Sequence, residues 1–176
     1  MGKIIFIIGG SRSGKSTYAV ESAKRYRRVC FIATSLALDK EMAERIRLHK
    51  ERRPDHWQTF EETKDIARCL KKIGNKFECI IIDCLTLLVS NLVLSGYRQK
   101  KIEDKIRGML DRLKKNKATS IIISNEVGLG IVPRNKLARN FRDIAGIINQ
   151  MVAKEAREVF FTVSGIPMKI KDEGRG

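Results

Sequence analysis

The amino-acid sequence predicts one α/β domain over residues 1–176, with a mainly parallel sheet and helices on both faces. Two observations lead to this fold class. Short apolar runs rich in Ile and Val recur along the chain, and segments with helical periodicity separate them. This alternation is typical of β-α-β units, in which each helix crosses the sheet to the next parallel strand. The length also fits a single compact domain.

Five apolar runs are the predicted strands. Their positions are apolar without alternation, as expected for strands whose two faces are both covered. The runs are Ile4–Ile8, Val29–Ala33, Ile80–Ile82, Ser120–Ser124 and Val159–Val163. A further short run, Met168–Ile170, follows the turn Gly165-Ile166-Pro167, and we expect it to add an antiparallel edge strand.

Helical periodicity predicts the segments between the strands. The expected helices are Ser16–Arg27, Lys40–Arg53, Thr63–Ile73, Lys101–Lys115 and Asn135–Arg157. The last of these is the clearest, because apolar residues recur at the spacing of one helix face. These residues are Leu137, Phe141, Ile144, Ile148 and Val152.

The chain is strongly basic, with 36 Lys and Arg against 20 Asp and Glu and a formal net charge of +16. One interpretation is an anionic partner such as nucleic acid or nucleotide phosphate. The other is a solvated basic surface on a heat-adapted protein. The charge is scattered over several segments and aromatic residues make up only 6%, so we favour the second interpretation and expect no nucleic-acid partner.

The cysteines and the apolar runs indicate the compartment. Cys30, Cys69, Cys79 and Cys84 form no Cys-x-x-Cys pair, and no histidine lies at metal-ligand spacing from them. Cysteines in or beside apolar strands are usually small buried hydrophobes, and free thiols predict a reducing, cytoplasmic location. No apolar stretch approaches the roughly 18 residues that would cross a bilayer, so no membrane insertion is expected.

One motif carries specific chemistry. The segment Gly9-Gly10-Ser11-Arg12-Ser13-Gly14-Lys15-Ser16 matches the P-loop pattern G-x-x-x-x-G-K-[ST] between a predicted strand and a predicted helix. Its glycines let backbone N–H groups face phosphates, and the helix N-terminus adds its positive dipole end. Lys15 is expected to reach the β- and γ-phosphates, and the Ser16 hydroxyl to bind Mg²⁺. The motif therefore predicts a nucleoside triphosphate site.

Asp83 ends the apolar run Ile80–Ile82. The carboxyl ends of parallel strands line the ligand crevice of such sheets, so Asp83 is a candidate Walker B residue that holds Mg²⁺ directly or through water. The alternative is an aspartate that only caps the following helix. The P-loop favours the metal role.

Two further segments are candidates for the site. His49 shares a helix face with Met42 and Ile46, which is typical of a packed histidine, yet basic residues follow it, and a neutral imidazole beside phosphate is a competent nucleophile. His56 has no such cluster and is expected to be structural. The loop Asn125–Gly130 follows another strand, where Glu126 is expected to act as a base or metal-shell residue or to cap a helix.

A set of segments over nearly the whole chain resembles one known family. They are the P-loop, Ile32–Ser35, Asp39–Ile46, His49-Lys50, Arg53-Pro54, His56-Trp57, Asn125–Gly128, Gly130–Pro133, Leu137–Arg139, Phe141–Gly146 and Val163–Ile166. Together they resemble the bifunctional adenosylcobinamide kinase/adenosylcobinamide-phosphate guanylyltransferase family of cobalamin biosynthesis. The block from Asn125 to Gly146 is far more specific than the P-loop.

The resemblance implies two reactions, a recombinase-like P-loop fold and a homotrimer. A nucleoside triphosphate, ATP or GTP, with Mg²⁺ phosphorylates adenosylcobinamide. GTP then transfers GMP to a histidine that falls on His49, and adenosylcobinamide phosphate displaces the histidine to give adenosylcobinamide-GDP. A phosphoramidate intermediate fits this scheme, because imidazole is both a nucleophile and a good leaving group.

The resemblance also implies nucleotide contacts outside the P-loop. These contacts fall on Thr34, Ser35, Leu36, Lys50, Glu51, Arg52, Arg53 and Glu61, with Asp83 at the metal. Asp83 stands where family members carry Glu, and Leu48 precedes His49 where some members carry a second histidine.

Two other functions are compatible with the motifs. A P-loop kinase of small molecules would use the same loop without the guanylyl step. A nucleic-acid-stimulated ATPase would use the basic charge, but the sequence lacks the interleaved aromatic and basic residues of a single-strand binding surface.

Overall fold

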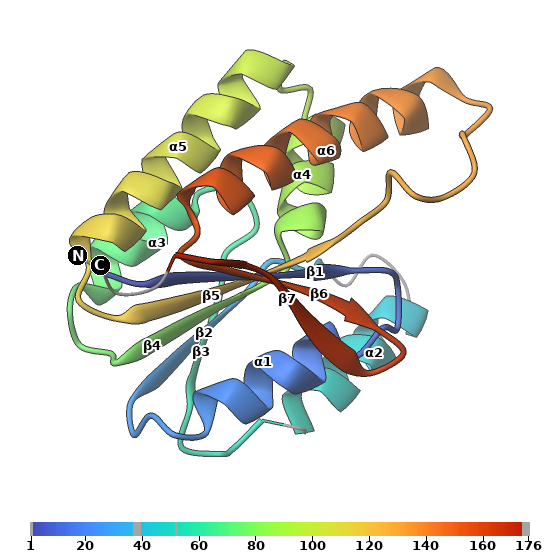
Figure 1. The fold of residues 1–176 in the computed structure, drawn as a ribbon. Coiled ribbons are helices and arrows are strands. Elements are labelled where there is room, and N and C mark those ends of the chain that lie inside the picture. Colours follow the sequence, from blue (N-terminus) through green and yellow to red (C-terminus); the bar gives the residue numbers. More distant parts are fainter. Residues whose placement is uncertain (1, 37–39, 52, 174–176) are drawn as a thin grey trace.

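The computed structural model describes residues 2–36, 40–51 and 53–173, and its centre is one seven-stranded sheet (Figure 1). The strands are β1 (Ile4–Gly9), β2 (Val29–Ala33), β3 (Gln58–Glu61), β4 (Cys79–Asp83), β5 (Thr119–Asn125), β6 (Glu158–Val163) and β7 (Ile166–Asp172). They lie in the order β3-β2-β4-β5-β1-β6-β7. All neighbouring pairs are parallel except β6 and β7, which are antiparallel.

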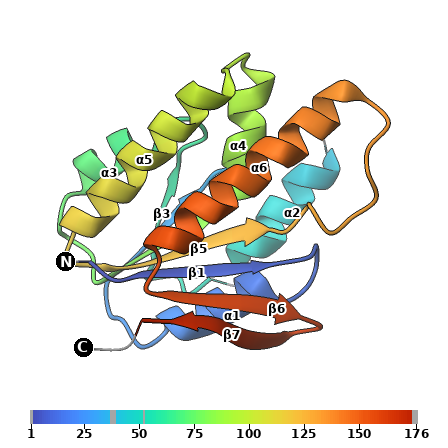
Figure 2. The same ribbon diagram turned by 45° about the horizontal axis from the view of Figure 1, so that its top comes forward.

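Helices cover both faces of the sheet (Figures 1 and 2). On one face lie α1 (Lys15–Ala23) and α2 (Lys40–Glu51). On the other lie α3 (Ile66–Ile73), α4 (Leu85–Leu94), α5 (Gln99–Lys115) and α6 (Lys136–Glu155). The predicted fold class is therefore confirmed, including the antiparallel edge strand, which is longer than expected.

Two elements were not predicted. Strand β3 reads Gln-Thr-Phe-Glu and is largely exposed at the sheet edge, so it lacks the apolar run of a central strand. Helix α4 is buried along most of its length and reads Leu-Thr-Leu-Leu-Val-Ser-Asn-Leu-Val-Leu, so no polar face reveals its period. The sequence patterns thus missed one strand that lacks an apolar run and one helix that lacks a polar face.

Local hydrogen bonds correct several helix boundaries. Helix α1 ends at Ala23, not at Arg27, because the Tyr26 N–H bonds the Ala23 carbonyl in a tighter turn. Helix α3 begins at Ile66 because the side chain of Asp65 accepts from the Arg68 N–H, which is a typical N-cap. Helix α6 is capped in the same way by Asn135, which accepts from Ala138.

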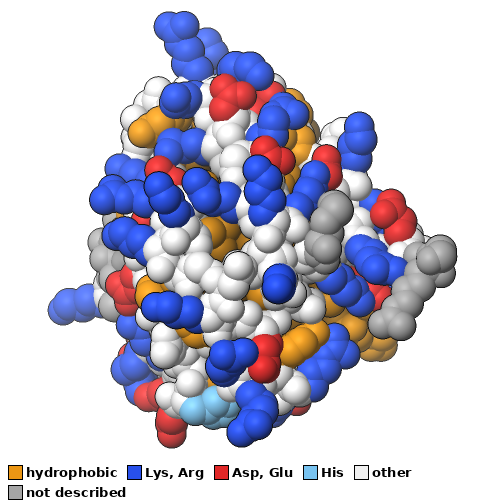
Figure 3. All heavy atoms as spheres, turned by 90° about the vertical axis from the view of Figure 1, so that its left-hand side faces the viewer, with side chains coloured by type: hydrophobic (Ala, Val, Ile, Leu, Met, Phe, Trp, Pro, Cys, Tyr) orange, Lys and Arg blue, Asp and Glu red, His pale blue; other side chains and the backbone are white. Residues whose placement is uncertain are grey.

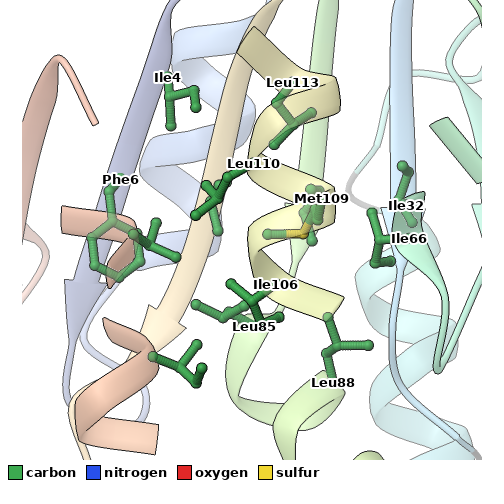
Figure 4. Close-up of a cluster of buried hydrophobic side chains, with 14 of the residues drawn as sticks. Ile4, Phe6, Ile32, Ile66, Leu85, Leu88, Ile106, Met109, Leu110 and Leu113 are labelled. Atoms are coloured by element: carbon green, nitrogen blue, oxygen red, sulfur yellow. The ribbon is translucent and has the colours of Figure 1, made fainter. Parts of the chain in front are cut away.

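The larger of two hydrophobic clusters fills the space between the sheet and helices α3 to α6 (Figure 4). There Phe6 and Ile32 of the strands meet Leu85, Ile106 and other side chains of the helices. Full burial of such a side chain contributes roughly 1.5–3 kcal/mol through the hydrophobic effect. The smaller cluster lies on the α1 face. Continuous burial on both faces explains why the central strands are apolar without alternation.

Register places the carboxyl ends of the parallel strands at one edge. Gly9 of β1 pairs with Asn125 of β5 and Thr162 of β6, while Ala33 of β2 pairs with Asp83 of β4 and with Glu61 of β3. The segments that follow these residues therefore emerge side by side. We call this the carboxyl edge of the sheet.

The four cysteines are free and buried, as predicted for Cys30, Cys79 and Cys84, and Cys69 is buried on α3. Burial raises the pKa of Cys79 and of Cys84 to about 12, so both are thiols at neutral pH. Among the described helices, none has the length and apolarity to cross a bilayer.

Lys and Arg side chains are spread over the face opposite the carboxyl edge, with Asp and Glu among them (Figure 3). Several of these cations are paired, including Arg28 with Glu78 at 3.6 Å and Lys114 with Glu155. Cations also lie in the last turns of α3 and α5, where they complement the negative end of the helix dipole. The positive charge therefore has a local structural role on this face.

We expect Phe6→Ala to lower the free energy of unfolding by about 3–5 kcal/mol, because Phe6 is fully buried and its removal leaves a cavity in the larger cluster. Leu94→Ala is the control: Leu94 is 63% exposed, so its loss should change stability by less than about 0.5 kcal/mol. Urea unfolding measures both variants. Equal stabilities would contradict this account of the core.

Candidate functional site

The P-loop lies at the carboxyl edge and joins β1 to α1. Gly9 is constrained by its neighbour, because a Cβ on it would lie 2.4 Å from the Thr162 carbonyl of β6. Arg12 and Gly14 both have positive φ, 56° and 95°, which turns the backbone around the loop. Gly10, Ser11 and Arg12 are exposed, whereas Ser13 is buried. The loop thus faces solvent on one side and rests on the sheet on the other.

The Lys15 side chain folds over the loop. Its ammonium donates to the Gly10 carbonyl and to the Ser13 hydroxyl, the latter at 3.4 Å. Burial lowers the pKa of Lys15, and the negative charge of Asp83 opposes that shift. The lysine is therefore a partly desolvated cation beside backbone groups of the loop.

Ser16 and Asp83, the two predicted metal ligands, are brought together. The Ser16 hydroxyl donates to the Asp83 carboxylate at 3.0 Å, across the 67 positions that separate them in the chain. Asp83 does not cap α4, whose N-cap is Cys84. A hydroxyl and one carboxylate beside a phosphate loop fit Mg²⁺, which is usually bound through one or two carboxylates with waters and phosphate oxygens.

Thr34 is fully buried and holds the turn that follows Asp83. Its hydroxyl donates to the Cys84 carbonyl at 2.7 Å and accepts from the Cys84 N–H at 2.8 Å. The Asn91 side-chain amide donates to the Thr34 carbonyl at 2.9 Å. The Thr34 side chain is thus engaged with backbone, while Ser35 is half-buried and Leu36 is exposed.

Several predicted nucleotide contacts of α2 and β3 form ion pairs in the structure. Lys50 pairs with Glu61 at 2.8 Å, which joins the end of α2 to the end of β3. Glu51 pairs with Arg47 on the exposed side of α2. The side chain of His49 and the whole of Arg52 lie outside the described residues.

Arg53 stacks on an aromatic ring of the sheet. Its guanidinium carbon lies 3.4 Å from the ring centroid of Phe31 in β2. Burial lowers the pKa of Arg53, against the attraction of the Asp83 and Glu61 carboxylates. Arg53 therefore supplies a partly buried positive charge near the acidic side of the site.

The loop after β5 touches the P-loop. The Glu126 N–H donates to the Gly9 carbonyl at 2.9 Å, and the Glu126 carboxylate accepts from the Gly128 N–H at 2.8 Å. The expectation that Glu126 caps a helix is wrong, because its carboxylate closes a turn and Asn135 caps α6. Exposed apolar side chains follow in the same loop, with Ile131 97% exposed.

A buried polar network beneath the carboxyl edge was not predicted. Thr86 and Ser124 share a hydrogen bond at 3.0 Å, and Ser124 donates to Asn149 at 2.7 Å. Asn149 then donates to the Asn125 carbonyl, and the Asn125 N–H donates to Thr86. This network ties α4, β5 and α6 together. One signal in the sequence was available: Asn149 is a polar residue within the apolar stripe of α6.

Comparisons with known proteins identify a single protein family to which this chain is similar. The family model described as cobinamide kinase / cobinamide phosphate guanyltransferase matches residues 5–170. The chain is 38% identical to the Escherichia coli bifunctional adenosylcobalamin biosynthesis protein CobU, over 96% of this chain and 99% of that protein. It is 40% identical to the Pseudomonas aeruginosa bifunctional adenosylcobalamin biosynthesis protein CobP, over 95% and 96%.

Solved structures are similar in fold. A KaiC-like protein from Pyrococcus horikoshii superposes with a TM-score of 0.52 at 15% identity, covering 91% of this chain and 70% of that one. The RadB recombinase gives 0.53 at 12% identity, covering 91% and 74%. A type III secretion ATPase gives 0.61 at 12%, covering 92% and 51%. At these identities the likeness concerns the fold alone, which agrees with the predicted recombinase-like class.

We expect Thr34→Val to lower the free energy of unfolding by about 1–3 kcal/mol, because it leaves the buried N–H and C=O of Cys84 without their hydroxyl partner. Thr34→Ser retains the hydroxyl and should lose less. Denaturant unfolding of the two variants measures the difference. A valine variant as stable as the serine variant would show that the hydroxyl does not hold the turn.

Proposed function

The chain belongs to the cobinamide kinase / cobinamide phosphate guanyltransferase family, and from this we propose that it catalyses both reactions named for the family. In the first, a nucleoside triphosphate phosphorylates the aminopropanol hydroxyl of adenosylcobinamide. In the second, GTP supplies GMP to adenosylcobinamide phosphate and yields adenosylcobinamide-GDP. The observation that carries the proposal is a P-loop with Ser16 bonded to Asp83, within a chain that matches bifunctional relatives over nearly its whole length.

The proposed nucleotide site begins with the residues of the P-loop. Backbone N–H groups of residues 9–16 and the ammonium of Lys15 would bind the phosphates. The partly desolvated ammonium is suited to this role, because its attraction for phosphate is less screened than in water. Lys15 would exchange its contacts with Gly10 and Ser13 for phosphate oxygens.

Ser16 and Asp83 are the proposed ligands of Mg²⁺. The ion would neutralise charge on the phosphate oxygens when it is bound. The Asp83 carboxylate reaches the Ser16 hydroxyl directly, which supports the assignment of both side chains to one metal ion.

His49 is the proposed nucleophile of the guanylyl step. An imidazole nitrogen would attack the α-phosphorus of GTP, a P–N bond would form, and the bond to pyrophosphate would break. A phosphate oxygen of adenosylcobinamide phosphate would then displace the histidine. Support comes from the contact between Lys50 and Glu61, since it holds the end of α2, next to His49 in the chain, at the carboxyl edge.

Other proposed nucleotide contacts surround that edge. Arg53 is a partly buried cation near Asp83 and Glu61. The negative charge of a bound triphosphate would further stabilise the charged form of its guanidinium. Lys50 and Glu61 are exposed beside it, so both are accessible to a nucleotide. Ser35 and Leu36 extend from the end of β2. The proposed nucleotide contacts also include Glu51, Arg52 and Thr34. Thr34 would act indirectly, because its hydroxyl holds the turn at Cys84.

The proposed setting is a homotrimer in the cytoplasm. Exposed apolar side chains support assembly, notably Leu129, Ile131 and Val132 in the loop before α6. Free buried thiols support a reducing compartment. Nucleic acid and membrane insertion have no part in the proposed activity.

We expect the protein incubated with GTP labelled on its α-phosphate to acquire an acid-labile, alkali-stable label on His49. His49→Ala should lose the label entirely while still binding GTP, because the P-loop is unchanged. His56→Ala is the matched control, since His56 is the other histidine of the chain and is exposed. Addition of adenosylcobinamide phosphate should release the label as product.

The labelling experiment distinguishes the bifunctional enzyme from a P-loop kinase that lacks the guanylyl step. Phosphorylation of adenosylcobinamide without any label on His49 would leave a kinase and remove the guanylyl step.

We expect Asp83→Asn to reduce both activities by about 100-fold or more, because it removes the carboxylate at the proposed Mg²⁺ position. Titration of activity against Mg²⁺ should show a raised requirement. Glu62→Gln is the control, because the described hydrogen bonds of the Glu62 carboxylate are with the backbone N–H groups of Lys64 and Asp65. An unchanged Mg²⁺ requirement in Asp83→Asn would rule out the metal role.

A further inference from the structure

The turn between β6 and β7 contacts the P-loop. The N–H of Gly165 donates to the Ser13 carbonyl at 2.9 Å. A Cβ on Gly14 would lie 2.9 Å from the Cα of Gly165, so the two backbones are in direct contact. This turn belongs to the segment Val163–Ile166, which the family resemblance marked without assigning it a role.

The turn has the geometry of a tight hairpin. Val163 pairs with Ile166, which leaves Ser164 and Gly165 as the two connecting residues. Their φ values are 50° and 83°. Positive φ at both positions is the signature of a type I′ turn, which matches the twist of the strands that it joins.

The far end of the hairpin is held in place. The Lys171 ammonium donates to the carbonyls of Ala153, Lys154 and Ala156 at 3.0, 2.9 and 2.8 Å, at the end of α6. Phe160 of β6 packs edge-on against Tyr18 of α1, with ring centroids 5.2 Å apart. The hairpin is thus attached to both helix layers, and its tip is presented to the P-loop at a defined position.

The contact with Ser13 determines how the next peptide group is oriented. In a planar trans peptide the C=O and the following N–H point in opposite directions. Because the Ser13 carbonyl points to Gly165, the N–H of Gly14 points away from the hairpin. Gly14 also has a φ of 95°, and it precedes α1 as its N-cap. Backbone N–H groups at such a position are the ones that bind phosphate.

We propose that the Ser164–Gly165 turn is a positioning element of the triphosphate site, which holds the Ser13–Gly14 peptide so that the Gly14 N–H faces the phosphates. The proposal rests on the proposed function only in that the P-loop binds a nucleoside triphosphate. It does not depend on chemistry at His49. Gly165 acts through the loop and does not touch the nucleotide.

A matched pair of substitutions tests this role. Gly165→Ala and Gly96→Ala both place a Cβ at positive φ, 83° and 79°, and in both cases the Cβ would meet nothing within 4 Å. The two variants therefore carry similar backbone strain, but Gly96 lies in the turn between α4 and α5. Gly165→Asn is the rescue, because Asn tolerates the left-handed conformation better than Ala.

Two readouts are needed for each variant: the melting temperature, and the Kd for a GTP analogue with a methylene bridge between its α- and β-phosphates, which His49 cannot cleave, measured by calorimetry with Mg²⁺. We expect similar losses in melting temperature for the two alanine variants. Only Gly165→Ala should bind the analogue more weakly, by about tenfold, as for the loss of one well-placed hydrogen bond. Gly165→Asn should recover most of the affinity.

Two results would overturn the proposal: equal Kd values for the two alanine variants, or a wild-type protein that does not bind the analogue. The second would remove the nucleotide site as well. A wild-type protein that binds the analogue and shows the Gly165 effect, but takes no label on His49, would support the turn's role and refute only the guanylyl step.

Discussion

The placement of β1 between β5 and β6 is the constraint on which the rest of the site depends. Parallel pairing brings Gly9 beside Asn125 on one side and Thr162 on the other. The P-loop starts at that point, so its two neighbours become its supports: the loop after β5 bonds the Gly9 carbonyl, and the turn after β6 bonds the Ser13 carbonyl. Gly9 has no space for a side chain, which shows how closely the strands confine the start of the loop.

Most polar side chains buried near the carboxyl edge are paired, although the Thr162 hydroxyl of β6 has no hydrogen-bond partner among the described residues. Thr34 engages the backbone of Cys84, and Thr86, Ser124 and Asn149 form a connected network below the β5 loop. An unpaired buried polar group costs about 1–3 kcal/mol, so such networks favour one arrangement of the strand ends over others. The platform that results carries the exposed part of the P-loop.

Electrostatics at the edge follow from the same geometry. Lys15 and Arg53 are cations whose pKa values burial lowers, and the carboxylate of Asp83 opposes both shifts. Low local dielectric strengthens their interaction with any anion that displaces water there. The much larger excess of positive charge over the rest of the surface is exposed and screened by salt, and it contributes little to this local field.

Local sequence patterns were sufficient for the five apolar strands, the P-loop and the acid at the end of β4, because each has its own period or motif. They were insufficient for β3, which is mostly exposed and lacks an apolar run, and for α4, which is buried along most of its length and has no polar face to show a helical period. The motifs also placed Ser16 and Asp83 at one metal ion, and the two side chains do meet. Tertiary structure alone decided that Thr34 turns inward to Cys84 and that Gly165 contacts the P-loop. The physical reason is strand register: it joins residues that lie far apart in the chain, and no short-range pattern encodes which strand ends become neighbours.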